Sequence, residues 1–112
     1  MDIKTISDNL IKESYKNNVQ DIYILPYKSQ FKIYYRYSKK RMFQKELMFE
    51  TGQQLISRSK YLGKMDIGER RKAQVGSLTY MLRENEIRLR LSSVGDYLQR
   101  ESLVIRLLYD LS

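Results

Sequence analysis

Apolar and polar residues alternate with a period of two in parts of this chain, and this pattern restricts the fold more than any other feature. The segment QFKIYYRYS (residues 30–38) begins its alternation at Phe31, and IRLRLSS (residues 87–93) begins its alternation at Ile87. Because successive side chains of a strand point to opposite faces, each segment predicts a strand with one buried and one exposed side. Strands of this kind are typical of antiparallel sheets.

Other segments complete the pattern of a sheet with two helices. Further strands are indicated at DIYILPY (21–27), RMFQKELMF (41–49), SLTYML (77–82) and SLVIRLLY (102–109). Helical spacing is found in KTISDNLIKESYKN (4–17) and ETGQQLISRSKYLGK (50–64). We expect Ser7 or Asp8 to help cap the first helix and Gly63 to end the second. The order of the segments predicts one α+β domain over residues 1–112, with a mainly antiparallel sheet and helices packed on one side.

The composition excludes several classes of site. The chain has neither cysteine nor histidine, which removes disulfides, the usual zinc ligands and the commonest general base. It also has no G-x-x-x-x-G-K phosphate loop. We therefore predict no metal site and no catalytic residues. Asp66, Glu69 and Glu101 could in principle form a carboxylate pair, but we expect them to be solvated surface acids.

The chain carries an excess of positive charge. Its net charge is +8, which favours contact with nucleic acid, nucleotide phosphates, acidic lipid or an acidic protein surface without choosing among them. No apolar run is long enough to span a bilayer and no signal peptide is evident, so the expected location is cytoplasmic.

Arginine is the residue type that stands out. Arg88 and Arg90 are two residues apart on one predicted strand and therefore share a face. Arg106 interrupts an apolar strand, where a guanidinium group needs an edge, an acid or a phosphate as its partner. Guanidinium groups bind phosphate through paired hydrogen bonds. The ordinary alternative is a solvated sheet face with local ion pairs, for example to Glu86 or Glu101.

The tyrosines suggest a different function, that of a basic nucleic-acid-binding module. Tyr34, Tyr35 and Tyr37 are interleaved with basic residues, and aromatic rings among cations can stack on bases while the cations hold phosphates. If the strand alternates, however, some of these rings face the core. Packing is the more usual role of such tyrosines, and no RRM, OB or KH signature is present.

A run of charges between two glycines carries the resemblance to a known family. The stretch MDIGERRKAQVGSLTYML (65–82) resembles LDIAERRLPQDG, a signature of the traffic ATPases that drive type II secretion, type IV pili and competence pseudopili. Four further motifs match in the order expected for the family. DIYILPY resembles DIHIEP, FKIYYRYS resembles VRFRIDG, LRLSS resembles VRVST, and RESLVIRLL resembles GEKVVIRLL. The GS step at Gly76 is closest to the competence branch. The chain is thus identified as a member of this family over nearly its whole length.

The resemblance implies a PAS-like α+β fold and an identity as the N-terminal domain of a larger hexameric ATPase. A linker and a RecA-like domain with the phosphate loop would follow in the intact protein, which would bind ATP and Mg²⁺ and power pseudopilus assembly for DNA uptake. The implied partners are that RecA-like domain, neighbouring subunits of a homo-hexamer and an inner-membrane pilus assembly platform protein, with no direct nucleic acid. The implied location is cytoplasmic, at the inner face of the membrane, and this fragment alone is expected to bind no cofactor and to be inactive.

The resemblance also assigns roles to individual arginines. In this family the arginines of the RVS and IRLL motifs reach across the interdomain cleft toward the nucleotide phosphates. Arg90 and Arg106 hold those two motif positions, whereas Arg88 has no such match. The implied ATP-phosphate contacts are therefore Arg90 and Arg106.

The charge cluster itself has two open interpretations. Glu69, Arg70 and Arg71 either make interdomain or intersubunit contacts or form a local ion-pair network that fixes the loop. Gly68 and Gly76 are expected to allow tight turns beside them. The chain also departs from the family pattern at Ala73, Val75, SVGD (93–96) and Arg100, so the loop conformations there stay open.

Overall fold

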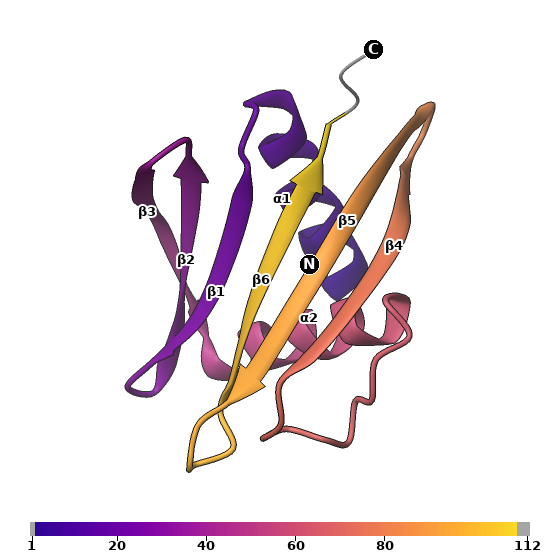
Figure 1. Cartoon of the computed structure of the whole chain (residues 1–112). Helices are drawn as coiled ribbons and strands as arrows, with labels where there is room; N and C mark the ends of the chain where they lie inside the picture. Colours follow the sequence, from indigo (N-terminus) through magenta and orange to yellow (C-terminus); the bar gives the residue numbers. More distant parts are fainter. Residues whose placement is uncertain (1, 110–112) are drawn as a thin grey trace.

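The computed structural model describes residues 2–109, which form an antiparallel sheet of six strands and two helices (Figure 1). The elements in chain order are α1 (Ile3–Lys16), β1 (Asp21–Tyr27), β2 (Gln30–Tyr37), β3 (Lys40–Met48), α2 (Phe49–Leu62), β4 (Gln74–Leu82), β5 (Asn85–Gly95) and β6 (Glu101–Leu108). Both helices lie on the same side of the sheet, so the predicted α+β class is confirmed. Residues 1 and 110–112 of the predicted domain lie outside the described residues.

The strand order differs from the chain order in one important respect. The sheet runs β3-β2-β1-β6-β5-β4, so the last strand lies between the first strand and β5. Every neighbouring pair is antiparallel. The two central strands of the sheet therefore come from opposite ends of the chain.

The hydrophobic core fills the space between the helices and one face of the sheet. Alternate residues of the strands supply most of it: Ile22, Ile24, Phe31, Ile33, Tyr35, Ile87, Leu89, Leu91, Leu103, Ile105 and Leu107. The helices add Leu10, Ile11, Leu55 and Ile56. We call this side the helix-covered face. The residues between the buried ones point to the other side, which no helix of residues 2–109 covers and which we call the open face.

The ends of the helices correct one detail of the sequence analysis and confirm another. Asp2, not Ser7 or Asp8, caps α1, because its Oδ1 accepts a hydrogen bond of 2.8 Å from the backbone of Thr5. Ser7 is buried instead. At the other helix, Gly63 does end α2, since its backbone N–H donates to the carbonyl of Ser59 over 2.9 Å.

Candidate functional site

One residue from each of five neighbouring strands forms a charged row across the open face. Arg90 of β5 lies directly opposite Arg106 of β6, and Arg106 lies opposite Asp21 of β1. The row continues to Arg36 of β2 and Arg41 of β3. Directly opposed residues have their Cβ atoms about 5 Å apart on the same face of a sheet. We call these five residues the arginine row.

Asp21 is the buried centre of the arginine row. Its side chain is only 1% exposed, and its two carboxylate oxygens are shared between two neighbours. Oδ1 accepts a hydrogen bond of 3.0 Å from Nε of Arg106, and Oδ2 accepts one of 2.6 Å from Nε of Arg36. A buried carboxylate needs such partners, because an unpaired one costs several kcal/mol.

The two arginines on Asp21 are held to different extents. Arg36 also contacts Asp21 through Nη2 and donates from Nη1 to the carbonyl of Ser38, so all its nitrogens are engaged. Arg106 contacts Asp21 through Nε, and its side chain is 53% exposed. The hydrogen bond and charge of Asp21 raise the pKa of Arg106, which stays cationic. Arg106 therefore presents charged terminal nitrogens to solvent.

These contacts decide between the alternatives left open for Arg106. The expected need for an acid is met by Asp21, and an ion pair of Arg106 with Glu101 is wrong, because Glu101 lies on the helix-covered face. Arg90 is exposed, and within residues 2–109 its side chain has no hydrogen bond or ion pair. The structure thus brings the two predicted site residues together as direct neighbours with outward-facing guanidinium groups.

The tyrosines of β2 divide between the two faces. Tyr35 is buried in the core, its hydroxyl donates to Glu13 over 3.1 Å, and burial raises its pKa to about 12. Tyr35 cannot stack on a base, so the nucleic-acid hypothesis is wrong for that residue. Tyr34 does reach the open face, but the guanidinium group of Arg41 lies 5.1 Å from its ring centre and 5.2 Å from that of Tyr23.

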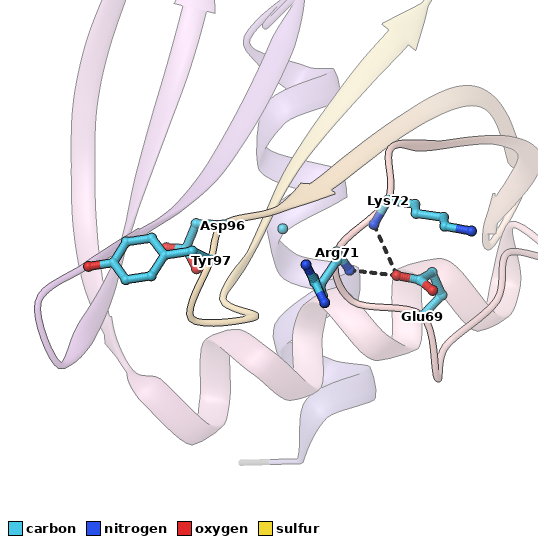
Figure 2. Close-up of a pocket in the computed structure, with 6 residues that line it drawn as sticks. Glu69, Arg71, Lys72, Asp96 and Tyr97 are labelled. Atoms are coloured by element: carbon cyan, nitrogen blue, oxygen red, sulfur yellow. Dashed lines mark hydrogen bonds between the residues drawn. The ribbon is translucent and has the colours of Figure 1, made fainter.

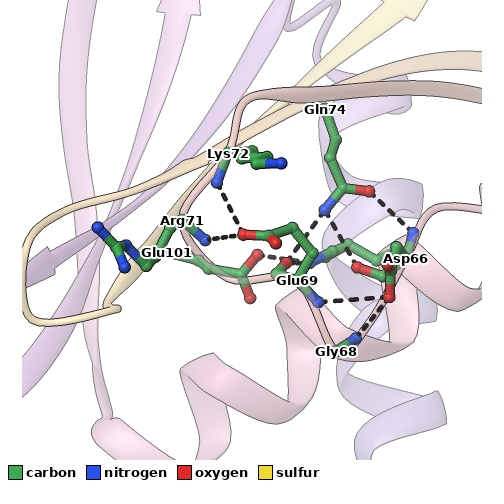
Figure 3. Close-up of polar contacts among 8 residues, drawn as sticks. Asp66, Gly68, Glu69, Arg71, Lys72, Gln74 and Glu101 are labelled. Carbon is green, nitrogen blue, oxygen red and sulfur yellow. Dashed lines mark hydrogen bonds and ion pairs between the residues drawn. The ribbon is translucent and has the colours of Figure 1, made fainter.

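Carboxylates fix the charge cluster between α2 and β4 by accepting hydrogen bonds from the backbone (Figure 3). Asp66 Oδ1 accepts from the N–H groups of Gly68 and Glu69 at 3.0 and 3.3 Å. Glu69 Oε1 accepts from those of Arg71 and Lys72 at 2.8 and 3.0 Å. The hydrogen bonds from Lys72 and then Arg71 lower the pKa of Glu69. The loop is therefore held by backbone contacts rather than by ion pairs between its side chains.

A buried ion pair ties this loop to the core. Lys60 of α2 is fully buried, and its Nζ donates to Glu101 Oε2 over 2.5 Å and to the carbonyl of Glu69 over 2.7 Å. The side chain of Glu101 is 6% exposed. The expectation that Glu101 is a solvated surface acid is therefore wrong, because a lysine placed 41 residues earlier in the chain neutralises it inside the protein.

The remaining charges of the loop line an open hollow (Figure 2). Its volume is about 510 Å³, and its lining residues are Glu69, Arg71, Lys72, Gly95, Asp96 and Tyr97. Arg70 points elsewhere, toward the side-chain amide of Gln53 on α2. The structure thus places Glu69 and Arg71 at one hollow but separates Arg70 from them.

The two glycines beside the charge cluster differ in their surroundings. Gly76 lies within β4, so the tight turn expected there is wrong, whereas Gly68 lies at a bend where its N–H donates to Asp66 Oδ1. No glycine within residues 2–109 has a positive φ. A Cβ atom on Gly76 would lie 2.8 Å from the carbonyl oxygen of Gly63. A Cβ atom on Gly95 would lie 1.6 Å from the carbonyl oxygen of Arg70, so the loop lies directly on the end of β5.

The described part of the chain lacks both a metal-binding cluster and a membrane-spanning helix. Residues 2–109 contain no cluster of three or more acidic side chains that could hold a metal ion. None of their helices has the length and apolar character needed to cross a membrane.

Comparison with known protein families identifies the class to which this antiparallel domain belongs. Residues 2–112 match the family described as "Type II/IV secretion system protein". The chain belongs to the type II/IV secretion system protein family, which confirms the resemblance found in its motifs.

Two curated relatives define the branch of the family. Competence protein ComGA of Bacillus subtilis (strain 168) is 41% identical over 106 residues, which are 95% of this chain and 30% of the relative. Competence protein ComGA of Streptococcus pneumoniae (strain ATCC BAA-255 / R6) is 37% identical over 108 residues, which are 96% of this chain and 34% of the relative. The chain is a homologue of these proteins and spans about a third of their length.

Proposed function

We propose that this chain is the N-terminal nucleotide-contacting and subunit-assembly domain of a hexameric ATPase that powers competence pseudopilus assembly for DNA uptake. The observation that carries the proposal is the pairing of Arg90 with Arg106 on the open face, where both guanidinium groups are exposed. The name of the two relatives and their greater length support it.

The proposed chemistry follows from fixed positive charge. In the intact protein a RecA-like domain would hold ATP and Mg²⁺, since this chain has no phosphate loop of its own. Guanidinium groups aimed at the phosphoryl oxygens stabilise the charge that develops there during hydrolysis. Closure of the open face over the nucleotide would couple domain position to nucleotide state. The protein would work in the cytoplasm, at the inner face of the membrane, with the pilus assembly platform protein as its partner there.

The same proposal assigns Glu69, Arg70 and Arg71 to contacts with a neighbouring domain or subunit. The exposed Arg71 at the hollow supports this role. Glu69 would contribute indirectly, because its carboxylate shapes the loop that presents Arg71.

The test is ATP hydrolysis by the intact protein with Arg90→Ala or Arg106→Ala. Each substitution is expected to lower kcat by at least about tenfold, since arginines that contact a transferring phosphoryl group typically contribute far more than that. Arg88→Ala is the matched control, because Arg88 lies on the same strand and face but outside the family motifs. Full turnover in the Arg90 and Arg106 variants, or measurable turnover by residues 1–112 alone, would contradict the proposal.

A nucleic-acid interface is the competing function, and the observation that favours it is the position of Tyr34 and Arg41 on the open face. Such an interface predicts binding of single-stranded DNA that weakens steeply with salt and is lost in Tyr34→Ala. Fluorescence anisotropy at low and moderate salt separates the two functions. The ATPase proposal expects no dependence on Tyr34.

A further inference from the structure

We infer that Asp21 is a positioning residue that holds Arg106 ready for a phosphate group. The inference rests on the proposed function, because it concerns the residue through which Asp21 would act. Asp21 is too deeply buried to touch a nucleotide itself, with only 1% of its side chain exposed. Its effect must therefore pass through the side chains that it contacts.

The geometry fixes one end of the Arg106 guanidinium group and leaves the other end available. Asp21 Oδ1 accepts from Nε, the nitrogen nearest the aliphatic stem, over 3.0 Å. The two terminal nitrogens, which form the fork that binds a phosphate through two hydrogen bonds, have no partner within residues 2–109. An arginine held in this way keeps its binding fork while losing much of its side-chain freedom.

The position of Arg90 explains why Arg106 needs the contact with Asp21. Arg90 and Arg106 are directly opposed on neighbouring strands, and like charges at that separation repel each other. Without an anion nearby, the two side chains would turn away from one another into solvent. Asp21 lies on the side of Arg106 opposite to Arg90, so its charge offsets the repulsion and draws Arg106 toward the sheet.

Arg36 completes the arrangement by fixing Asp21 from the other side. It contacts Oδ2 through Nε and Nη2, so the carboxylate cannot rotate freely. Its Nη1 donates to the carbonyl of Ser38, so each nitrogen of Arg36 already has a partner, whereas the two terminal nitrogens of Arg106 have none within residues 2–109. The arginine row therefore contains arginines with different tasks: Arg90 and Arg106 are available to a ligand, whereas Arg36 supports Asp21.

The functional test is a double-mutant cycle on ATP hydrolysis by the intact protein with Asp21→Asn, Arg106→Ala and both together. Asp21→Asn is expected to lower kcat/KM by about tenfold, and to have no further effect when Arg106 is already alanine. If the double variant instead loses the product of the two single-variant effects on kcat/KM, Asp21 acts independently of Arg106, and the inference is overturned. Asp8→Asn is the control, since Asp8 is an ion-paired aspartate of α1, away from the open face.

A second variant keeps the test decisive should Asp21→Asn fail to fold. Arg106→Lys retains the charge at an exposed position, but all the donors of lysine are on a single nitrogen. That single nitrogen cannot donate to Asp21 and also bind a phosphate through two parallel hydrogen bonds, as the arginine side chain can. Turnover is expected to fall close to that of Arg106→Ala, and wild-type turnover would show that charge alone suffices and that positioning is unnecessary.

A structural measurement separates this inference from the proposed function. In the 112-residue chain, the Nε–H group of Arg106 is expected to give a slowly exchanging NMR signal that is lost in Asp21→Asn. An unchanged signal would overturn the positioning role. If the signal is lost but Arg106→Ala hydrolyses ATP normally, the anchoring contact stands and the proposed function fails.

Discussion

The two faces of the sheet treat charged groups in opposite ways. On the helix-covered face, Lys60 and Glu101 are both buried, and each satisfies the other. On the open face, Asp21 is buried beneath arginines that it satisfies only in part, so Arg106 keeps exposed donors. The buried ion pair is satisfied within the protein, whereas the open face keeps exposed donors of Arg106 that can bind a ligand.

The difference follows from the cost of burial. A charge in the core must be fully paired, because removing one partner leaves an ion that water cannot reach. A charge on the open face can remain incompletely paired at little cost, since solvent screens it. Substitutions of buried residues on the helix-covered face should therefore change stability, and those of exposed arginines on the open face should change binding.

The largest expected effect comes from breaking the buried ion pair. Lys60→Met should lower the free energy of unfolding by about 3–5 kcal/mol, because Glu101 is then buried without a partner. Urea denaturation measures the loss. The double variant Lys60→Met with Glu101→Leu should recover much of it, and a Lys60→Met protein as stable as the wild type would show that the pair does not constrain the core.

Adjacent residues of β5 give the most direct comparison of the two faces. Leu91 is fully buried on the helix-covered face, and Leu91→Ala should cost about 2–5 kcal/mol of stability. Arg90 is the residue before it, and Arg90→Ala should stay within about 0.5 kcal/mol of the wild type. Thermal or urea unfolding of both variants checks this, and similar losses at the two positions would contradict the assignment of faces.

A smaller effect is expected where the loop lies on β5. Gly95→Ala places a Cβ atom within 1.6 Å of the carbonyl oxygen of Arg70, so the loop must move and about 1–3 kcal/mol should be lost. Gly68→Ala is the control, because its nearest neighbour is a side-chain oxygen of Asp66 at 3.5 Å. Equal melting temperatures for the two variants would mean that the loop is not held against the strand.

The smallest effect concerns acid stability of the same loop. Backbone hydrogen bonds lower the pKa of Glu69 in the folded protein. The stability that the ionised carboxylate contributes is therefore fully present above the ordinary pKa of 4.5, and it is lost as the pH falls through the lowered pKa. Glu69→Gln should remove this part of the acid dependence. Urea midpoints between about pH 6 and pH 3 measure it, and identical pH profiles for the variant and the wild type would contradict the role of the carboxylate.

The alternation of residues was sufficient to predict most of the fold. It placed Ile87 and Leu91 on one face and Arg90 on the other, and the structure confirms this. It also required some tyrosines of β2 to face the core, which Tyr35 does. Periodicity does not predict which strands pair with each other. The central position of β6 in the sheet therefore could not be predicted from any local pattern.

The site was less predictable, because its contacts join residues far apart in sequence. The charges of Arg106 and Asp21 are visible in the sequence, but the contact between them spans 85 residues. The helical pattern of α2 places Lys60 outside its apolar side, so the sequence predicts a solvated lysine. Lys60 is buried because the start of β6, with Glu101, lies beside α2. The phosphate roles of Arg90 and Arg106 stay predictions from the family motifs.

The central place of β6 has a consequence for how the chain folds as it is synthesised. Before residues 101–108 emerge from the ribosome, the sheet consists of two separate pieces, β3-β2-β1 and β5-β4, that share no strand contact. The last strand must insert between them, and contacts across so long a chain separation slow folding. The nascent domain therefore exposes the unpaired edges of β1 and β5 until β6 emerges, and we expect capture by chaperones to matter most in this interval.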